Sequence, residues 1–501
     1  MVLINTWRDK THTCHLAPLC STHDTNDKPA TAFFDEISLS QKLSYDKFSD
    51  KVIGYVDLGP LGRKNEYADH ALVFMLNGLH KSWKQPIAFF LHNILVEIET
   101  GLKILCTVCD QGATLFFTQH SVKPHDLKVL ISQVISQVEI ETGLKILCTV
   151  CDQGATNRAA INLLCRENNE PGPHFFINNH KILTIFDPPH LLKSTRNALL
   201  KYHIQFDQTK MAKIDHIRQC FNIDKRKRFQ ALRRIREVYL HLKTHSRLKM
   251  KVCVAARTLS HTVASTLEEM VSNPNNNIPS QAIETAEFVH DVDQLFDSFN
   301  GRTTKPECGK PYRRCMSNRS PHAVLWNRLL PKINSWMFID EKVKKKVMPF
   351  KSGWLTTIAA TKELWNICKD LGFKFLRTRA LNQDPLENSF ASIRHLGAEN
   401  VNPSCYQFIS SFKTSVLNNL ITPSSNKNCE TDDGSILDNL QDFLESSITK
   451  NDFIDLDVLD VNEIENLALP LPDTDVTGHE GNTLAYVAGF IIKNLKSIKE
   501  M

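Results

Sequence analysis

The sequence predicts an α/β protein whose sheet is interrupted by a long, mainly helical insertion. Three observations lead to this prediction. Short apolar runs, such as residues 146–151, are rich in β-branched residues and bounded by turn residues, as buried strands are. Several of these runs are followed by apolar residues at helical spacing, and strand–helix alternation is typical of α/β folds. Between about residues 201 and 375 the strand pattern gives way to helical periodicity.

Composition limits the class of protein. The chain has 501 residues, 42% hydrophobic and 23% charged, which is ordinary for a globular protein. No stretch reaches the roughly eighteen apolar residues of a membrane-spanning helix, so we expect no membrane anchor and no secretory signal. The fourteen cysteines are scattered, which favours reduced thiols in the cytosol or nucleus. A net charge of +5 permits nucleic-acid binding through local patches without requiring it.

Three strand patterns open the core. Residues 30–37 read ATAFFDEI and carry Asp35 directly after two phenylalanines, and residues 51–59 and 70–79 give the next two strands. Short connections between successive strands favour an antiparallel meander. We therefore expect Asp35 at the end of the first strand of this meander.

The run ILCTVC, residues 146–151, predicts a strand buried on both faces. Asp152 follows it, a Gln-Gly-Ala turn comes next, and Asn157 is expected to cap the following helix. Open α/β sheets place their functional sites at the carboxyl ends of such strands. The alternative is that Asp152 only helps to cap the helix.

One segment, VEIETGLKILCTVCDQGAT, occurs twice without a change, at residues 96–114 and 138–156. Structural repeats diverge and recur at a regular period, so this pair indicates a recent duplication or a gene-model error. The two copies cannot both occupy one central strand. Only the second is followed by a helix pattern, so we take Asp152 as the working residue and Asp110 as its passive duplicate.

Residues 182–186 predict a further strand, which Pro188 and Pro189 end before a helix over residues 191–200. Three strands followed by strand–helix alternation, with carboxylates after the first and fourth strands, is the plan of an RNase H-like core.

The insertion begins with a strongly basic segment of helical periodicity, residues 224–251. Its cations either form a solvated helix face or contact phosphates. Residues 253–271 and 284–301 predict two further helices. The whole chain then divides into a flexible lead-in (1–30), the first part of the core (31–200), the insertion (201–375), the second part of the core (376–420), an acidic linker (421–480) and a C-terminal helix (481–501).

Three carboxylates suit a metal site of the kind that acts on nucleic-acid backbones. Glu387 lies near a helix start, because Pro385 suits the first turn of a helix. Phosphoryl transfer on DNA commonly uses two divalent metals held by a few carboxylates, and magnesium prefers such oxygen ligands. Asp35, Asp152 and Glu387 come from separate elements and meet this need.

Several long motifs occur in one order: DEI after two phenylalanines, GYVDLG, KQPIAFF, VCDQGATN, IFDPPHLLKSTRN and LNQDPLENSFASIR. This set, from about residue 31 to 412, resembles P-element-type DNA transposases, including relatives that carry a THAP DNA-binding domain. The resemblance implies an RNase H-like catalytic domain split by a GTP-binding insertion at residues 201–375. It implies a catalytic, metal-binding triad that falls here on Asp35, Asp152 and Glu387, with Mg²⁺ or Mn²⁺.

The resemblance also implies a GTP site. The FDSFN stretch is similar to the family's guanine-contacting segment and places Phe296, Asp297 and Asn300 there. Three further residues match other nucleotide-site positions: Lys251, Val252 and Asp384. The alternative for Phe296, by composition, is ordinary core packing.

The sequence departs from the family's pattern at its N-terminus. Cys20 and His23 have a Cys-x-x-His spacing, but the paired cysteines of a THAP zinc module are missing, so we expect no THAP domain. The resemblance implies a nuclear transposase that acts on transposon-end DNA, with GTP, as a homo-oligomer. The duplication also fits a degenerate copy. The alternative is a domesticated, non-catalytic nuclear protein that keeps the fold to bind DNA or protein partners.

Overall fold

A computed structural model of the chain describes residues 28–47, 50–79, 83–92, 96–97, 103–104, 122–167, 172–241, 246–340, 344–396 and 402–417. They belong to the first of two compact units, which ends at Asp442. The predicted lead-in, except for residues 28–30, the predicted acidic linker and the predicted C-terminal helix lie outside these residues, as does Asp110.

The first part of the core is a mixed sheet. Its eight strands run in the spatial order β11 (His174–Ile177), β12 (His180–Phe186), β10 (Lys145–Cys151), β1 (Pro29–Ser38), β6 (His70–Gly78), β7 (Lys84–His92), β4 (Tyr55–Asp57) and β5 (Arg63–Tyr67). β1, β10 and β12 are parallel neighbours, whereas β1, β6 and β7 are antiparallel. Two short ribbons accompany the sheet, formed by β2 (Ser44–Asp46) with β3 (Lys51–Ile53) and by β8 (Val96–Glu97) with β9 (Lys103–Ile104).

The predicted meander is wrong in its second member. Residues 51–59 do not form one strand next to β1 but divide into β3 and β4. β4 joins the sheet beyond β7, where Asp57 pairs with Leu91. β6 and β7 are almost wholly buried, whereas the short β4 is only partly buried and β5 is largely exposed. The long apolar strands therefore occupy the centre of the sheet, where both faces are buried, and the short strands lie at its edge.

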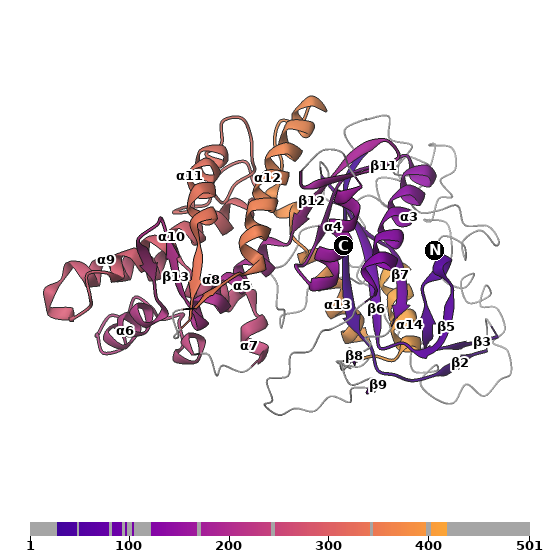
Figure 1. Cartoon of the computed structure of the whole chain (residues 1–501), viewed down its shortest axis with the longest axis horizontal. Coiled ribbons are helices and arrows are strands. Elements are labelled where there is room, and N and C mark those ends of the chain that lie inside the picture. Colours follow the sequence, from indigo (N-terminus) through magenta and orange to yellow (C-terminus); the bar gives the residue numbers. More distant parts are fainter. Residues whose placement is uncertain are drawn as a thin grey trace, which may run out of the picture. The chain divides into compact units, whose positions relative to one another are not determined.

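Five helices accompany the sheet: α3 (Pro124–Thr142), α4 (Ala155–Arg166), α5 (Pro188–Lys201), α13 (Asp384–Leu396) and α14 (Cys405–Leu417). α13 contacts β1, and α14 contacts β7, so segments from opposite ends of the chain pack together (Figure 1). The predicted strands at 146–151 and 182–186 are confirmed as β10 and β12. α5 begins earlier than predicted, since Pro188 and Pro189 fill its first turn.

The two copies of the duplicated segment fold differently where both are described. Val96 and Glu97 form β8 in the first copy, whereas the same dipeptide in the second copy lies inside α3. The second copy supplies β10, the central parallel strand.

The insertion combines helices with a small sheet. Its helices are α6 (Ile214–Asp224), α7 (Ser246–Met250), α8 (Val252–Thr258), α9 (His261–Ser272), α10 (Ala282–Ser298), α11 (His322–Ser335) and α12 (Pro349–Asp370). Its strands, in spatial order, are β14 (Lys210–Ala212), β13 (His203–Phe206), β15 (Met337–Ile339) and β16 (Lys345–Lys346).

Two helix predictions in the insertion need correction. Residues 253–271 form α8 and α9 rather than one helix, because the Ser260 side chain accepts a hydrogen bond from the Val263 N–H and starts a new helix. Residues 225–241 of the basic segment form an irregular loop rather than a helix, apart from a single 3-10 turn (Glu237–Leu240), and the short α7 lies at Ser246–Met250.

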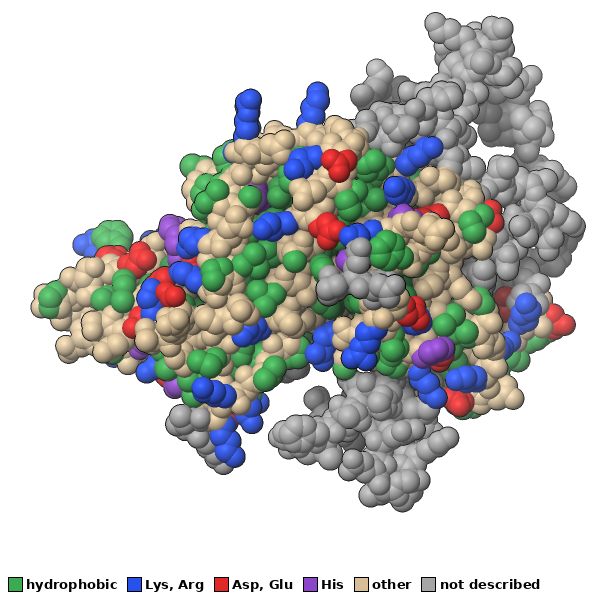
Figure 2. Space-filling model, turned by 45° about the horizontal axis from the view of Figure 1, so that its top comes forward, with side chains coloured by type: hydrophobic (Ala, Val, Ile, Leu, Met, Phe, Trp, Pro, Cys, Tyr) green, Lys and Arg blue, Asp and Glu red, His purple; other side chains and the backbone are tan. Residues whose placement is uncertain are grey.

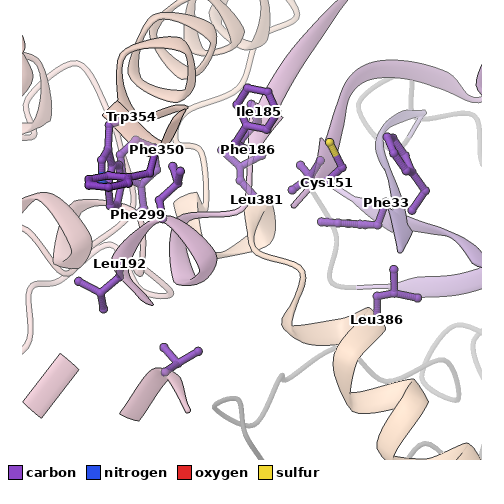
Figure 3. Packing of buried hydrophobic residues seen from close by; sticks show 14 of the residues in the cluster. Phe33, Cys151, Ile185, Phe186, Leu192, Phe299, Phe350, Trp354, Leu381 and Leu386 are labelled. Carbon is purple, nitrogen blue, oxygen red and sulfur yellow. The ribbon is translucent and has the colours of Figure 1, made fainter. Parts of the chain in front are cut away.

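One hydrophobic cluster runs from the sheet into the insertion. Figure 3 shows Phe33 and Cys151 from the sheet on one side, Phe299 and Trp354 on the other, and Phe186 between them. α12 packs on β12 and α5, and its Thr357 side chain bonds to the Phe186 backbone. Among the described helices, none is long and apolar enough to cross a membrane.

Candidate functional site

Asp35 and Asp152 come from neighbouring parallel strands. Phe33 of β1 lies opposite Val150 of β10. Each aspartate is two residues further along, so both side chains lie at about the same level on one face of the sheet. The prediction that Asp35 ends the first strand is wrong, because pairing with β6 continues β1 to Ser38.

The Asp152 carboxylate is oriented through its Oδ1 atom. Oδ1 accepts hydrogen bonds from the Gly154 backbone N–H (2.9 Å) and from Asn157 Nδ2 (2.6 Å). Gly154 is the N-cap residue of α4, which begins at Ala155, so the prediction that Asn157 caps this helix is wrong. Asn157 instead uses its side chain, from the first turn of α4, to hold Asp152.

Asp187 connects the end of β10 to the approach to α13. Its side chain is almost fully buried, and its backbone N–H donates to the carbonyl of Cys151, the residue before Asp152 (2.9 Å). Asp187 Oδ1 accepts from the Gln383 N–H (2.8 Å), and Oδ2 accepts from the His190 N–H (3.0 Å) as the N-cap of α5.

Gln383 completes this connection on the side of β1. The Gln383 Nε2 atom donates to the backbone carbonyl of Phe34, the residue before Asp35 (2.9 Å). The backbone carbonyl of Gln383 accepts from the Glu387 N–H (3.1 Å). Hydrogen bonds thus tie the backbone beside Asp35 and Asp152 to the first turn of α13. We name Asp35, Asp152 and Glu387 the acidic cluster.

His190 lies between two members of the acidic cluster. Its Nδ1 is 3.8 Å from Asp152 Oδ2, and its Nε2 is 3.6 Å from Glu387 Oε1. Burial and the Lys193 charge oppose protonation of His190, but Glu387, Asp187 and Asp152 outweigh them and raise its pKa. Burial alone would raise the pKa of Glu387, whereas contact with His190 lowers it. The side chains of His190, Asp152 and Glu387 are 26%, 28% and 29% exposed, so solutes can reach them.

Asp35 is repelled by the other two members of the acidic cluster. Burial, followed by the charges of Asp152 and Glu387, raises the pKa of Asp35 well above its usual value. A divalent cation would relieve this repulsion, and carboxylate oxygens are the ligands that Mg²⁺ and Mn²⁺ prefer. Across the described residues, no three His, Cys, Asp or Glu side chains already stand close enough together to hold a metal ion. The donor atoms fit such an ion by type and charge, and the carboxylates would have to close around it.

The residues predicted to bind GTP lie in two places: Lys251 and Val252 at the start of α8, and the other four near the end of α10 and the start of α13. Asp297 near the end of α10 is 5% exposed, and both its oxygens accept hydrogen bonds from Lys310 Nζ (2.9 and 2.8 Å). Burial raises the pKa of Asp297, and Lys310 opposes that rise. Phe296 beside it is partly buried against the hydrophobic cluster. Lys251 and Val252 begin α8, which, like α10, packs on α5.

A buried arginine connects Asn300 to Asp384. Arg379 Nη1 donates to Asn300 Oδ1 (3.3 Å), and Arg379 Nη2 donates to Asp384 Oδ2 (3.2 Å). All three side chains are less than a tenth exposed. Asp384 and Glu387 share the first turn of α13. We name Phe296, Asp297, Asn300 and Asp384 the nucleotide cluster, and its last member directly adjoins the acidic cluster on this helix.

Sequence reasoning missed five side chains that hold the two clusters: Asp187, His190, Lys310, Arg379 and Gln383. Asp187 has a local signal, because an aspartate before two prolines is a good helix N-cap. The other four contact residues that are distant in the sequence or lie on another element, so no local pattern indicates them.

Gly301 offers a test of how closely the backbone packs beside Asn300. A Cβ atom at this position would lie 1.9 Å from the carbonyl oxygen of Arg314. We expect Gly301→Ala to lower the free energy of unfolding by about 1–3 kcal/mol or more, because the backbone must shift. Thermal unfolding measures this loss, and the exposed Thr304→Ala in the same loop is the control. Equal unfolding temperatures for Gly301→Ala and the wild type would contradict the packing.

Asp293, one turn before Asp297, predicts a pH-dependent stability. Burial and the charge of Asp297 raise its pKa to about 6. Because the folded state holds this proton more tightly than the unfolded state, the contribution to stability is present below about pH 4 and lost as the pH rises through 6. We expect Asp293→Asn to match the wild type at pH 4 and to be more stable by up to about 3 kcal/mol at pH 7. Urea unfolding at both values measures the difference, and a constant difference would contradict the assignment.

Comparisons with known families agree with this architecture. Three family models match in sequence order: the TNP-like, RNase H N-terminal domain at residues 10–100, the TNP-like, GTP-binding insertion domain at 189–311, and the TNP-like, RNase H C-terminal domain at 380–413. The class is therefore an RNase H-like α/β protein whose core is split by a GTP-binding-type insertion, which confirms the predicted fold class.

Two relatives make the resemblance more specific. The Transposable element P transposase of Drosophila melanogaster is 25% identical over 389 residues, which are 77% of this chain and 44% of that protein. This chain thus spans less than half the length of that relative. The structure titled Drosophila P element transposase strand transfer complex has the same fold, with a TM-score of 0.63 at 21% identity, covering 84% of this chain and 86% of that one. The chain carries the TNP-like domains and resembles P-element-type transposases, as predicted.

Proposed function

We propose that this protein cleaves DNA strands and transfers them, with divalent metal ions at the acidic cluster and GTP at the nucleotide cluster as cofactors. The observation that supports this most directly is that Asp35 on β1 interacts electrostatically with Asp152, directly after β10, and with Glu387 on α13. Burial, followed by repulsion from Asp152 and Glu387, raises the pKa of Asp35, and a bound cation would stabilise the three carboxylates together.

The chain's own residues have distinct roles in this proposal. Bound divalent metal would activate the attacking oxygen and stabilise the leaving oxygen. Asn157 and the Gly154 N–H fix Asp152 by one oxygen and leave the other facing the site. Asp187 and Gln383 hold the backbones of β1, β10 and α13 in one arrangement. His190 supplies a positive charge between two carboxylates when it is protonated.

The proposed partners follow from the same function. DNA is the substrate, specifically transposon ends, because one relative is a P element transposase and a solved relative is titled a strand transfer complex. Such a reaction takes place in the nucleus, and joining two DNA ends favours a homo-oligomer. GTP is proposed because residues 189–311 match a GTP-binding insertion domain.

Nicking of supercoiled plasmid DNA tests the proposal without knowledge of the target sequence. We expect the purified protein to relax the plasmid with Mg²⁺ or Mn²⁺ and GTP, and to leave it intact with EDTA. Binding of the plasmid without nicking under every metal and nucleotide condition would contradict the proposal. That outcome would favour the second candidate, a non-catalytic nuclear protein that keeps the fold to bind DNA or partners. The exact duplication in the sequence is the observation that favours this second candidate.

A further inference from the structure

The irregular loop after α6 presents an unusual density of positive charge. We name residues 225–236 the basic loop. It contains seven cationic side chains, of which all but Lys227 are exposed: Lys225, Arg226, Lys227, Arg228, Arg233, Arg234 and Arg236. Figure 2 shows that Lys and Arg side chains stand out from the surface at several places on one face of the molecule.

The basic loop has a defined conformation although it is neither helix nor strand. The buried Asp224 accepts hydrogen bonds from the backbone N–H groups of Ala231 (3.0 Å) and Leu232 (2.8 Å). The side chains of Leu232 and Ile235 are 3% and 7% exposed, so they anchor the loop in the hydrophobic cluster. These anchors hold the arginines outward at fixed places.

Few of these charges are balanced by the protein. Lys225 lies 3.4 Å from Glu237, and Lys227 lies 3.7 Å from Glu269. The Lys225 pair is about 60% exposed on both sides, and pairs of this kind contribute little. Within the described residues, no ion pair joins a carboxylate to Arg226, Arg233 or Arg234. These arginines can therefore form ion pairs with a bound polyanion.

Phe229 adds an aromatic face to the charge. Its side chain is 76% exposed, so most of the ring is open to solvent. The Arg228 guanidinium carbon lies 5.7 Å from the centre of its ring. An exposed aromatic ring beside arginines is the arrangement on which unpaired bases stack while the backbone contacts the cations.

We propose that the basic loop binds DNA, with its arginines on the phosphates and Phe229 stacked on an unpaired base. This rests on the proposed function for the choice of DNA, and it adds a contact surface that lies on the insertion, apart from the acidic and nucleotide clusters. An anionic membrane is the less suitable partner, because within the loop only Phe229 is an exposed large apolar side chain, too little to enter a bilayer.

Salt titration of DNA binding, in EDTA so that no cleavage occurs, tests the proposal. The variant replaces Arg233, Arg234 and Arg236 by glutamine, and the control replaces Lys344, Lys345 and Lys346, three exposed cations of the same insertion. For single-stranded DNA, loss of three phosphate contacts should make the slope of log K against log salt less negative by about 2, and the control should leave the slope unchanged. Phe229→Ala should weaken binding of single-stranded DNA by about fivefold or more and affect duplex binding less.

Three outcomes would overturn the inference. The loop variant and the control variant lose DNA affinity equally, or the loop variant binds DNA as the wild type does, or the loop variant loses only its binding to phosphatidylserine vesicles. Plasmid nicking is measured separately. If the protein nicks DNA but the loop variant binds DNA as the wild type does, the inference is refuted and the proposed function is not. A protein that binds DNA through the loop but never nicks refutes the function alone.

Discussion

Replacing Asp152 by asparagine is expected to abolish metal-dependent nicking, with a loss of about 1000-fold or more. Asparagine keeps an oxygen that can accept from the Gly154 N–H and Asn157, so the local fold should survive. It removes the negative charge that would face the metal, and metal ions contribute several kcal/mol to such reactions. Initial rates of plasmid nicking, with the unfolding temperature as a check on folding, measure the effect.

Asp110→Asn is the matched control, because it changes the identical position of the first copy of the duplicated segment. We expect it to leave nicking intact, since β10 is formed by the second copy. Loss of nicking with Asp110→Asn but not with Asp152→Asn would mean that the first copy occupies the central strand in solution. The choice of Asp152 as the working residue would then be wrong.

Replacing Asp297 by alanine is expected to weaken GTP binding by about 10- to 100-fold. A carboxylate can accept two hydrogen bonds from guanine, from the ring N–H and the amino group, and losing a charged acceptor costs about 1.5–3 kcal/mol. ATP binding should change less, because adenine does not present this pair of donors. Fluorescence titration with labelled GTP and ATP analogues measures both affinities.

Lys310 provides the control for this experiment. In the structure Lys310 occupies both oxygens of Asp297. We expect Lys310→Ala to keep GTP binding or to strengthen it, because the carboxylate is released while the acceptor remains. If Lys310→Ala weakens GTP binding as much as Asp297→Ala does, the ion pair rather than the carboxylate supports the site. Equal affinity of the wild type for GTP and ATP would also contradict the assignment.

The strands of the core were predictable wherever apolar runs are long. The runs at β1, β6, β10 and β12 have the composition of buried strands, and the structure has strands at each of them. Which strands pair was not predictable in the same way. β7 and β4 compete for the place beside β6, and the outcome depends on burial of the whole strand, which no local window contains.

The duplicated segment shows why local sequence is insufficient. The same Val-Glu dipeptide forms β8 in one copy and part of α3 in the other. Since the residues are identical, the difference comes from the residues that precede them. Residues 124–137 form an amphipathic helix that continues through Val138. Propensity is a weak preference that tertiary context overrides.

The candidate site was predictable in its acidic residues and not in the contacts that hold them. Asp35 and Asp152 follow apolar runs, and Glu387 follows a proline that suits a helix start. His190 lies between two of these carboxylates only because α5 and α13 meet, and Arg379 reaches Asn300 across a wide gap in the sequence. The basic loop was predicted as a helix because its spacing is helical, whereas Asp224 and two buried side chains hold it in another conformation.

We expect the acidic cluster to hold divalent metal ions. Anomalous diffraction from crystals soaked in Mn²⁺ tests this site most directly, because the signal locates the ion without assuming any activity. We expect one or two Mn²⁺ ions, about 4 Å apart if two are bound, with ligand oxygens from Asp35, Asp152 and Glu387. Manganese bound elsewhere on the protein, with no peak between these three carboxylates, would contradict it.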